Sequence, residues 1–201
     1  DLGELQVALQ FFEQEHQLVL QLYQDFPENV EYKNNLAISY ERLGQTNADL
    51  GKLQVALQFF EQEHQLALQL YQGFPENVEY KHGLAISYSK LGMMQLILDN
   101  FHESLSDLEL HNQYIKELYD LDSQNIRFSS SYAESLTIGI LLKKLQGEDI
   151  SLEELSSPKI SFDELHQKSG VVSYAKKSAI IAKMQAPDAD LRALIIELLR
   201  F

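Results

Sequence analysis

The sequence predicts an all-α fold, built as a solenoid of antiparallel helix pairs with a C-terminal helical cap. The first observation is an internal repeat: residues 2–44 and 50–92 align without a gap at an offset of 48 and differ at seven of 43 positions. A fixed period of this size is typical of stacked repeat proteins. The second is composition, since only four prolines and nine glycines occur in 201 residues, which favours long helices.

The repeated unit contains small and aromatic residues at a recurring spacing. A Leu-Gly pair is followed by an alanine and, four residues later, by a phenylalanine. The pattern occurs as Leu43-Gly44, Ala56 and Phe60, with Ala8 and Phe12 in the preceding copy and Leu91-Gly92 opening the next. This spacing resembles the tetratricopeptide repeat (TPR) family. The resemblance implies a right-handed solenoid whose concave groove binds a protein or peptide.

The repeat departs from the TPR pattern in two respects. Asn47 and Gln95 stand where the family has tyrosine, and the period is 48 instead of about 34. The additional residues of this longer period are shared between both helices of a pair. Equal lengthening keeps the antiparallel hairpin packed along its full length. We therefore expect a long-helix variant of the TPR solenoid over residues 1–145.

Apolar residues at helical spacing predict six helices in this region. The first, residues 1–24, is a second-type (B) helix, capped by Asp1. First-type (A) and B helices then alternate. They are predicted at 30–44 (A), 50–72 (B, ended by Gly73 in a left-handed conformation), 78–91 (A), 101–121 (B) and 126–145 (a degenerate A).

Residues 146–201 do not follow the repeat in sequence and are predicted to form the cap. Ser151-x-x-Glu154 and Ser161-x-x-Glu164 are capping-box patterns. They predict two short helices separated around Pro158, the second ended by Gly170. Two further helices are expected at 171–185 and 188–200.

The first predicted helix is a B helix without a preceding A helix. The chain is therefore expected to begin in mid-repeat, as a fragment of a longer array or with a partner covering the exposed face. Leu5, Leu9 and Phe12 are the predicted self-association surface, through which the chain would form a homo-oligomer.

The charge distribution limits the classes of partner. Residues 1–156 carry a net charge of −16 and residues 157–201 a net charge of +2. An acidic solenoid argues against nucleic acid, whose binding needs clustered lysine and arginine, and suits a basic or amphipathic protein or peptide. No apolar segment is long enough for a membrane span and no signal peptide is visible, so we expect a cytoplasmic protein.

The sequence contains no pattern that indicates catalysis. It has no cysteine, no HExxH, no GxSxG and no phosphate-binding loop. Six histidines are present, but their spacing does not place ligands together. Asp120-x-Asp122 lacks the glycine and the glutamate that a calcium loop requires at its sixth and twelfth positions. We predict a protein that is not an enzyme and has no catalytic residue, metal or cofactor.

The differences between the two copies concentrate in helix A and the turn after it. Positions 34, 41, 45 and 48 lie on one helical stripe, which in TPR proteins lines the groove. The predicted partner-binding residues are Asn34, Ile38, Glu41, Gln45 and Asp49 in one repeat, and His82, Ile86, Ser89, Met93 and Ile97 in the next. They form a polar-to-apolar gradient suited to an amphipathic or extended peptide. No lysine faces the groove, so the carboxylate-clamp ligands of some TPR proteins are not expected.

The predicted function is a non-enzymatic interaction scaffold that binds a peptide or helix of a partner in this groove. Two alternatives stay open: a structural or oligomerisation module, and a sensor arm of a larger signalling protein. Decay of the repeat, without any selection on the groove, would also explain the differences between the copies.

Overall fold

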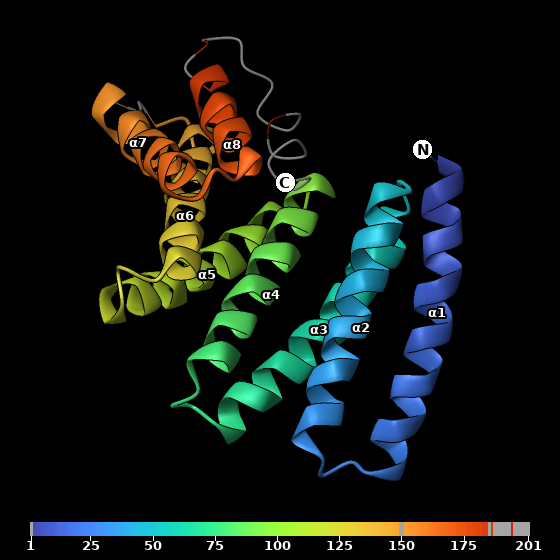
Figure 1. The fold of residues 1–201 in the computed structure, drawn as a ribbon. Helices are drawn as coiled ribbons and strands as arrows, with labels where there is room; N and C mark the ends of the chain where they lie inside the picture. The colour runs from blue at the N-terminus through green and yellow to red at the C-terminus, as the bar shows by residue number, and fades with distance from the viewer. Residues whose placement is uncertain (1, 149–150, 185, 187–193, 195–201) are drawn as a thin grey trace. The chain divides into compact units, whose positions relative to one another are not determined.

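The structure, a computed structural model, describes residues 2–148, 151–184, 186 and 194. This part of the chain contains eight α-helices and no strand (Figure 1). The helices are α1 (Leu2–Asp25), α2 (Val30–Asp49), α3 (Leu53–Gly73), α4 (Val78–Ile97), α5 (Phe101–Leu121), α6 (Ile126–Leu145), α7 (Leu152–Ser169) and α8 (Val172–Lys183). The predicted all-α class is confirmed. Within each of its two units, consecutive helices pack on one another, which is compatible with a helical solenoid.

The chain divides into two compact units, Asp1–Asp107 and Leu108–Phe201, with the boundary inside α5. In the first unit α2 packs on both α1 and α3, and α3 packs on α4. In the second unit α7 packs on both α6 and α8. The ring of Tyr119 on α5 stacks on that of Tyr132 on α6, with 4.2 Å between centroids.

The start of every A helix repeats with the 48-residue period. Asn29, Asn77 and Asn125 are the N-caps of α2, α4 and α6, and all three have extended backbone. In each case the side-chain Oδ1 accepts hydrogen bonds from the backbone N–H groups two and three residues later. Because these N–H groups have no partner inside the helix, the asparagine fixes where each A helix begins.

The turn after every A helix repeats as well. Gly51, Asp99 and Gly147, spaced by 48, all have left-handed backbone with φ of 74°, 67° and 79°. The B helices end with the same period, at Gly73, Leu121 and Ser169. The backbone repeat therefore continues through residue 169, well beyond the two near-identical copies, and α7 occupies a B-helix position.

Several predicted helix ends need correction. Helices α2 and α4 continue to Asp49 and Ile97, five and six residues past the predicted ends. The reason is that the Leu-Gly pair lies inside the helix: a Cβ built on Gly44 lies 2.6 Å from a ring carbon of Phe60, so this glycine permits close packing of α2 on α3. Gly73 is the last helical residue of α3 and does not have left-handed backbone.

The prediction of two short helices around Pro158 is wrong. Helix α7 runs unbroken from Leu152 to Ser169 with Pro158 inside it. The Ser151–Glu154 capping box is present, whereas the Ser161 hydroxyl donates to the carbonyl of Ser157 as part of the same helix. Pro158 removes one helical hydrogen bond, and its ring is buried inside the unit. Gly170 ends α7 in left-handed backbone, as predicted. The predicted helix at 188–200 lies outside the described residues.

The core of the first unit joins its helices in two clusters. Leu36 and Ala37 of α2 pack on Leu66 of α3, with Val19 and Tyr23 of α1 against them. A second cluster joins α3 to α4: Ala56, Leu57, Phe60, Leu91 and Met94. Full burial of one such leucine contributes up to about 1.5–3 kcal/mol. Packing, more than helix propensity, holds these helices together.

Candidate functional site

The predicted partner-binding residues divide into two sets, which we call the groove stripe: Asn34, Ile38, Glu41, Gln45 and Asp49 on α2, and His82, Ile86, Ser89, Met93 and Ile97 on α4. The α2 set is accessible. Ile38 and Asp49 are exposed, and the other three are half-buried. The Gln45 amide donates to Asp49 Oδ1 at 3.1 Å, which aligns two of the polar side chains along the helix.

The α4 set is less accessible. His82 and Met93 are buried, whereas Ile86, Ser89 and Ile97 are half-buried. Met93 is 1% exposed, so its side chain belongs to the core. The gradient from polar to apolar along the groove stripe is therefore also a gradient from exposed to buried. A periodicity argument identifies the face of a helix but not how much of that face a neighbouring element covers.

A lysine on α4, outside both sets, contacts one residue of the α2 set and one glutamate of α3. Lys90 Nζ on α4 lies 2.6 Å from Glu41 Oε1 on α2 and 3.2 Å from Glu63 Oε1 on α3. Lys90 also lies over the Phe60 ring, 5.8 Å from its centroid. Burial raises the pKa of the Glu63 carboxyl to about 7, while Lys90 acts to lower it and Glu41 acts to raise it. Glu63 Oε2 is buried without a hydrogen-bond partner.

The same contact occurs 48 residues earlier, in a different environment. Arg42 on α2 donates to both carboxylate oxygens of Glu15 on α1, at 2.6 and 2.8 Å, and lies over the Phe12 ring. The Glu15 side chain is 43% exposed, whereas that of Glu63 is 8% exposed. Sequence comparison shows both pairs but not that only the second pair is buried.

Two histidines repeat in the same way. His16 and His64 each lie within hydrogen-bond distance of a serine hydroxyl, at 2.9 Å from Ser39 and 3.0 Å from Ser87. Both serine hydroxyls also donate to a backbone carbonyl, so each histidine Nδ1 must carry the proton and donate to the serine. Burial lowers the pKa of both imidazoles. These histidines therefore join B helices to A helices through hydrogen bonds to serine.

On α6 the positions equivalent to the groove stripe contact the chain itself. Glu134, which corresponds to Ile38 and Ile86, accepts a hydrogen bond from Lys177 of α8. Thr137 and Leu141, the next two equivalent positions, are buried. Lys144, further along α6, donates to the carbonyl of Met184 just after α8. In the second unit, two lysine contacts thus connect α8 to this face of α6.

The predicted self-association residues are only partly accessible. Leu9 is buried, and Phe12 and Leu5 are half-buried. Among the exposed apolar side chains of α1, Phe11, Leu18 and Leu22 lie on its other side. We call these three residues the open face of α1. The predicted residues and the open face of α1 are therefore different sets of side chains on the same helix.

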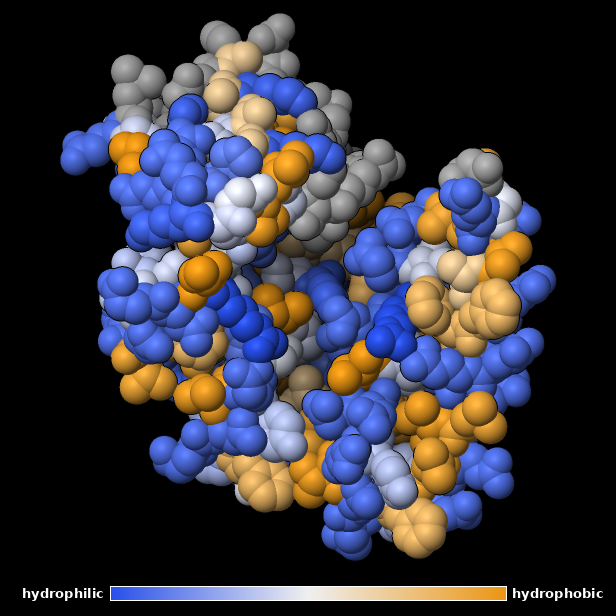
Figure 2. Space-filling model, in the orientation of Figure 1, coloured by the Kyte–Doolittle hydropathy of each residue, from blue (hydrophilic) through white to orange (hydrophobic). Residues whose placement is uncertain are grey.

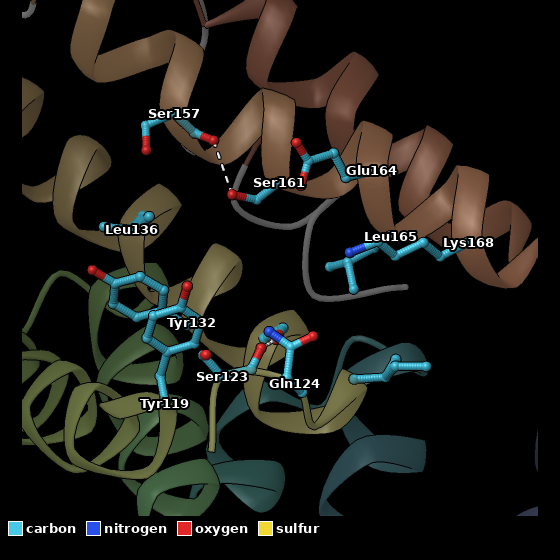
Figure 3. Close-up of a pocket in the computed structure, with 12 residues that line it drawn as sticks. Tyr119, Ser123, Gln124, Tyr132, Leu136, Ser157, Ser161, Glu164, Leu165 and Lys168 are labelled. Carbon is cyan, nitrogen blue, oxygen red and sulfur yellow. Dashed lines mark hydrogen bonds between the residues drawn. The ribbon is translucent and has the colours of Figure 1, made fainter. Parts of the chain in front are cut away.

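The second unit contains a pocket of about 580 Å³ between the end of α5, the first half of α6 and α7. Figure 3 shows Tyr119 and Tyr132 side by side in it, with Ser157 and Ser161 of α7 facing them. Its lining is mainly hydroxyl and amide groups and contains Glu164 and Lys168.

Among the described residues, no three histidine, aspartate or glutamate side chains lie close enough to hold a metal ion. None of the helices described there is both long enough and apolar enough to cross a membrane.

Comparison of the chain with protein-family models, with curated proteins and with solved structures finds no match.

Proposed function

We propose that this protein is a non-enzymatic interaction module of TPR-like type, which binds an amphipathic, basic helix or peptide of a partner along the groove stripe. The observation that carries the proposal is the accessible part of α2. There Ile38 is exposed between polar residues, and Glu41, Gln45 and Asp49 follow it at spacings of three and four. One apolar side chain surrounded by acids and amides suits a partner helix with both apolar and basic residues.

The ion cluster supports the proposal by fixing the position of α2 against its neighbours. Lys90 of α4 contacts both α2 and α3, so a partner on α2 would meet a surface that is already ordered. Preordered surfaces lose less conformational entropy on binding. Ile86 and Ile97 on α4 are half-buried and extend the apolar part of the surface.

The test uses the full chain and two panels of fluorescein-labelled amphipathic helical peptides, one basic and one acidic, followed by fluorescence anisotropy. Basic peptides should bind, and Ile38→Asp and Asp49→Lys should each weaken binding, by about tenfold for the first. Val55→Asp is the matched control, because Val55 is exposed on α3 outside the groove stripe. Circular dichroism checks that each variant is folded.

Two results would overturn the proposal. One is the absence of binding across both panels. The other is binding that Val55→Asp weakens as much as Ile38→Asp does, which would mean that peptides adhere to the acidic surface without using the groove stripe.

A further inference from the structure

Helices α1 and α3 provide a comparison within one molecule. Residues 5–24 and residues 53–72 are identical except at one position, Val19 and Ala67. A difference in exposure between equivalent side chains therefore reports a difference in neighbours, since the sequence is the same.

On the side that faces the following A helix, Leu9 and its equivalent Leu57 are both 9% exposed. The opposite side differs: Leu18 is 66% exposed and Leu66 is 8% exposed, and Leu22 is 41% exposed and Leu70 is 4% exposed. Phe11 is exposed and Phe59 is half-buried. Along α1, apolar side chains recur among hydrophilic ones on the molecular surface (Figure 2, right).

On α3, two equivalents of the open face of α1, Leu66 and Phe59, contact α2. Leu66 packs in one cluster with Leu36 and Ala37. The ring of Phe59 lies 6.2 Å from that of Tyr40, and Gly44 is so close to the Phe60 ring that a methyl group would not fit. The face that α2 presents to α3 therefore contains Leu36 and three small residues, Ala37, Gly44 and Ala48, with Tyr40 between them.

We propose that the open face of α1 binds a helix of a partner protein that has the α2 pattern: small residues at the positions of Ala37, Gly44 and Ala48, and an aromatic residue at the position of Tyr40. This surface is separate from the groove stripe, and the inference does not depend on the proposed function. It rests on the packing of α2 on α3, because α3 has nearly the same sequence as α1 and its contacts with α2 are known.

Charge adds to the complementarity. Glu41 of α2 lies 2.6 Å from Lys90, and Arg42 is the equivalent of Lys90 in the first copy. A bound helix of the α2 pattern brings its own acid at the Glu41 position beside Arg42, whose side chain is 46% exposed. A second copy of the chain does not offer such a helix, because its α2 is packed between α1 and α3. Two copies, each with a net charge of −14, also repel.

The experiment titrates the full chain into a labelled peptide with the sequence of residues 29–52 and measures fluorescence anisotropy. We expect saturable binding that Leu18→Glu weakens by about tenfold or more, since the substitution places a charge in an apolar contact. Val7→Glu is the matched control: Val7 is 53% exposed and its equivalent Val55 is 40% exposed, so this position is uncovered in both copies. Because Leu18 and Val7 are exposed, neither substitution removes a contact with α2.

Two altered peptides test the pattern itself. A Gly44→Leu peptide should lose binding, because its side chain would meet the Phe12 ring, the equivalent of Phe60. A Glu41→Lys peptide should bind more weakly, because it places a cation beside Arg42. The inference is overturned if the parent peptide does not bind, if Leu18→Glu binds it as well as the unaltered chain does, or if the Gly44→Leu peptide binds equally. It is also overturned if light scattering shows a dimer that Leu18→Glu dissociates while the peptide has no affinity.

Discussion

Single residues in this protein show how much of a side chain's chemistry depends on its neighbours. Glu15 and Glu63 occupy the same place in two nearly identical helices, and each contacts a cation 27 residues later. Only Glu63 is buried, beside Lys90 and with a second carboxylate, Glu41, on the other side of the lysine. Desolvation then dominates over the attraction of the single lysine, so the carboxyl holds its proton more strongly.

This raised pKa predicts a pH dependence of stability. The folded protein holds the Glu63 proton up to about pH 7, whereas the unfolded chain releases it near pH 4.5. Between these values the folded state binds more protons, so the contribution of Glu63 to the free energy of unfolding falls as pH rises. We expect Glu63→Gln to gain stability relative to the unaltered protein across this window, by up to about 1.4 kcal/mol per pH unit.

Urea unfolding followed by circular dichroism at several pH values measures this difference. Glu61→Gln is the control, because Glu61 is an exposed glutamate on the same helix and does not belong to the Lys90 cluster. A difference between Glu63→Gln and the unaltered protein that stays constant from about pH 4.5 to about pH 7 would contradict the prediction.

At the scale of elements, short local patterns set most of the helix boundaries. Asparagine caps start α2, α4 and α6, and a left-handed residue follows each of them. The left-handed position is glycine in two copies and Asp99 in the other, and aspartate is among the few other residues that tolerate it. The turn geometry persists where the helix sequences have diverged, because it depends on one cap and one turn residue in each copy.

Packing between helices leaves room for a side chain at one helical glycine but not at another. Gly44 faces Phe60 at 2.6 Å from the Cβ it lacks, whereas Gly83, in the middle of α4, has no atom within 4 Å of its missing Cβ. Alanine at either site improves helix propensity by about 1 kcal/mol, but at Gly44 it overpacks the contact with α3 at a cost of about 1–3 kcal/mol. We expect Gly44→Ala to be less stable than Gly83→Ala by about that cost.

Urea unfolding of the two variants side by side measures the difference, and the gain in helix propensity cancels in the comparison. Equal stabilities would mean that the Phe60 ring moves aside without cost, and that the glycine is not needed for the close approach of α2 and α3.

The whole molecule is dominated by excess negative charge. It has 30 acidic and 16 basic residues, and residues 1–156 hold the entire excess. Repulsion among these carboxylates opposes the compact state, and salt screens it over about 10 Å at 0.1 M. We expect the melting temperature to rise by a few degrees between about 0.02 and about 0.5 M sodium chloride.

Calorimetry in sodium chloride and in choline chloride tests this expectation, since the two salts share ionic strength but differ in cation. A melting temperature that falls with either salt would show that exposed ion pairs such as Lys116–Asp120, which salt also screens, outweigh the general repulsion.

Much of this architecture could be predicted from the sequence. The internal repeat, the all-α class and the bounds of α5 and α6 follow from periodic apolar residues and from caps and turn residues, which act within a few positions of the chain. The candidate surfaces lie on α1, α2 and α4, which are helices that the sequence predicts. These features are local, so one copy of the repeat predicts the next.

The tertiary structure alone decided which of these faces are accessible. Met93 is buried and Ile38 is exposed although both were assigned to one stripe, and Leu18 and Leu66 differ in exposure although their helices match. Helix α7 continues through Pro158, where its local pattern predicted an end. The physical reason is common to all three: periodicity determines which side of a helix is apolar, whereas the burial of that side depends on a second element that packs against it.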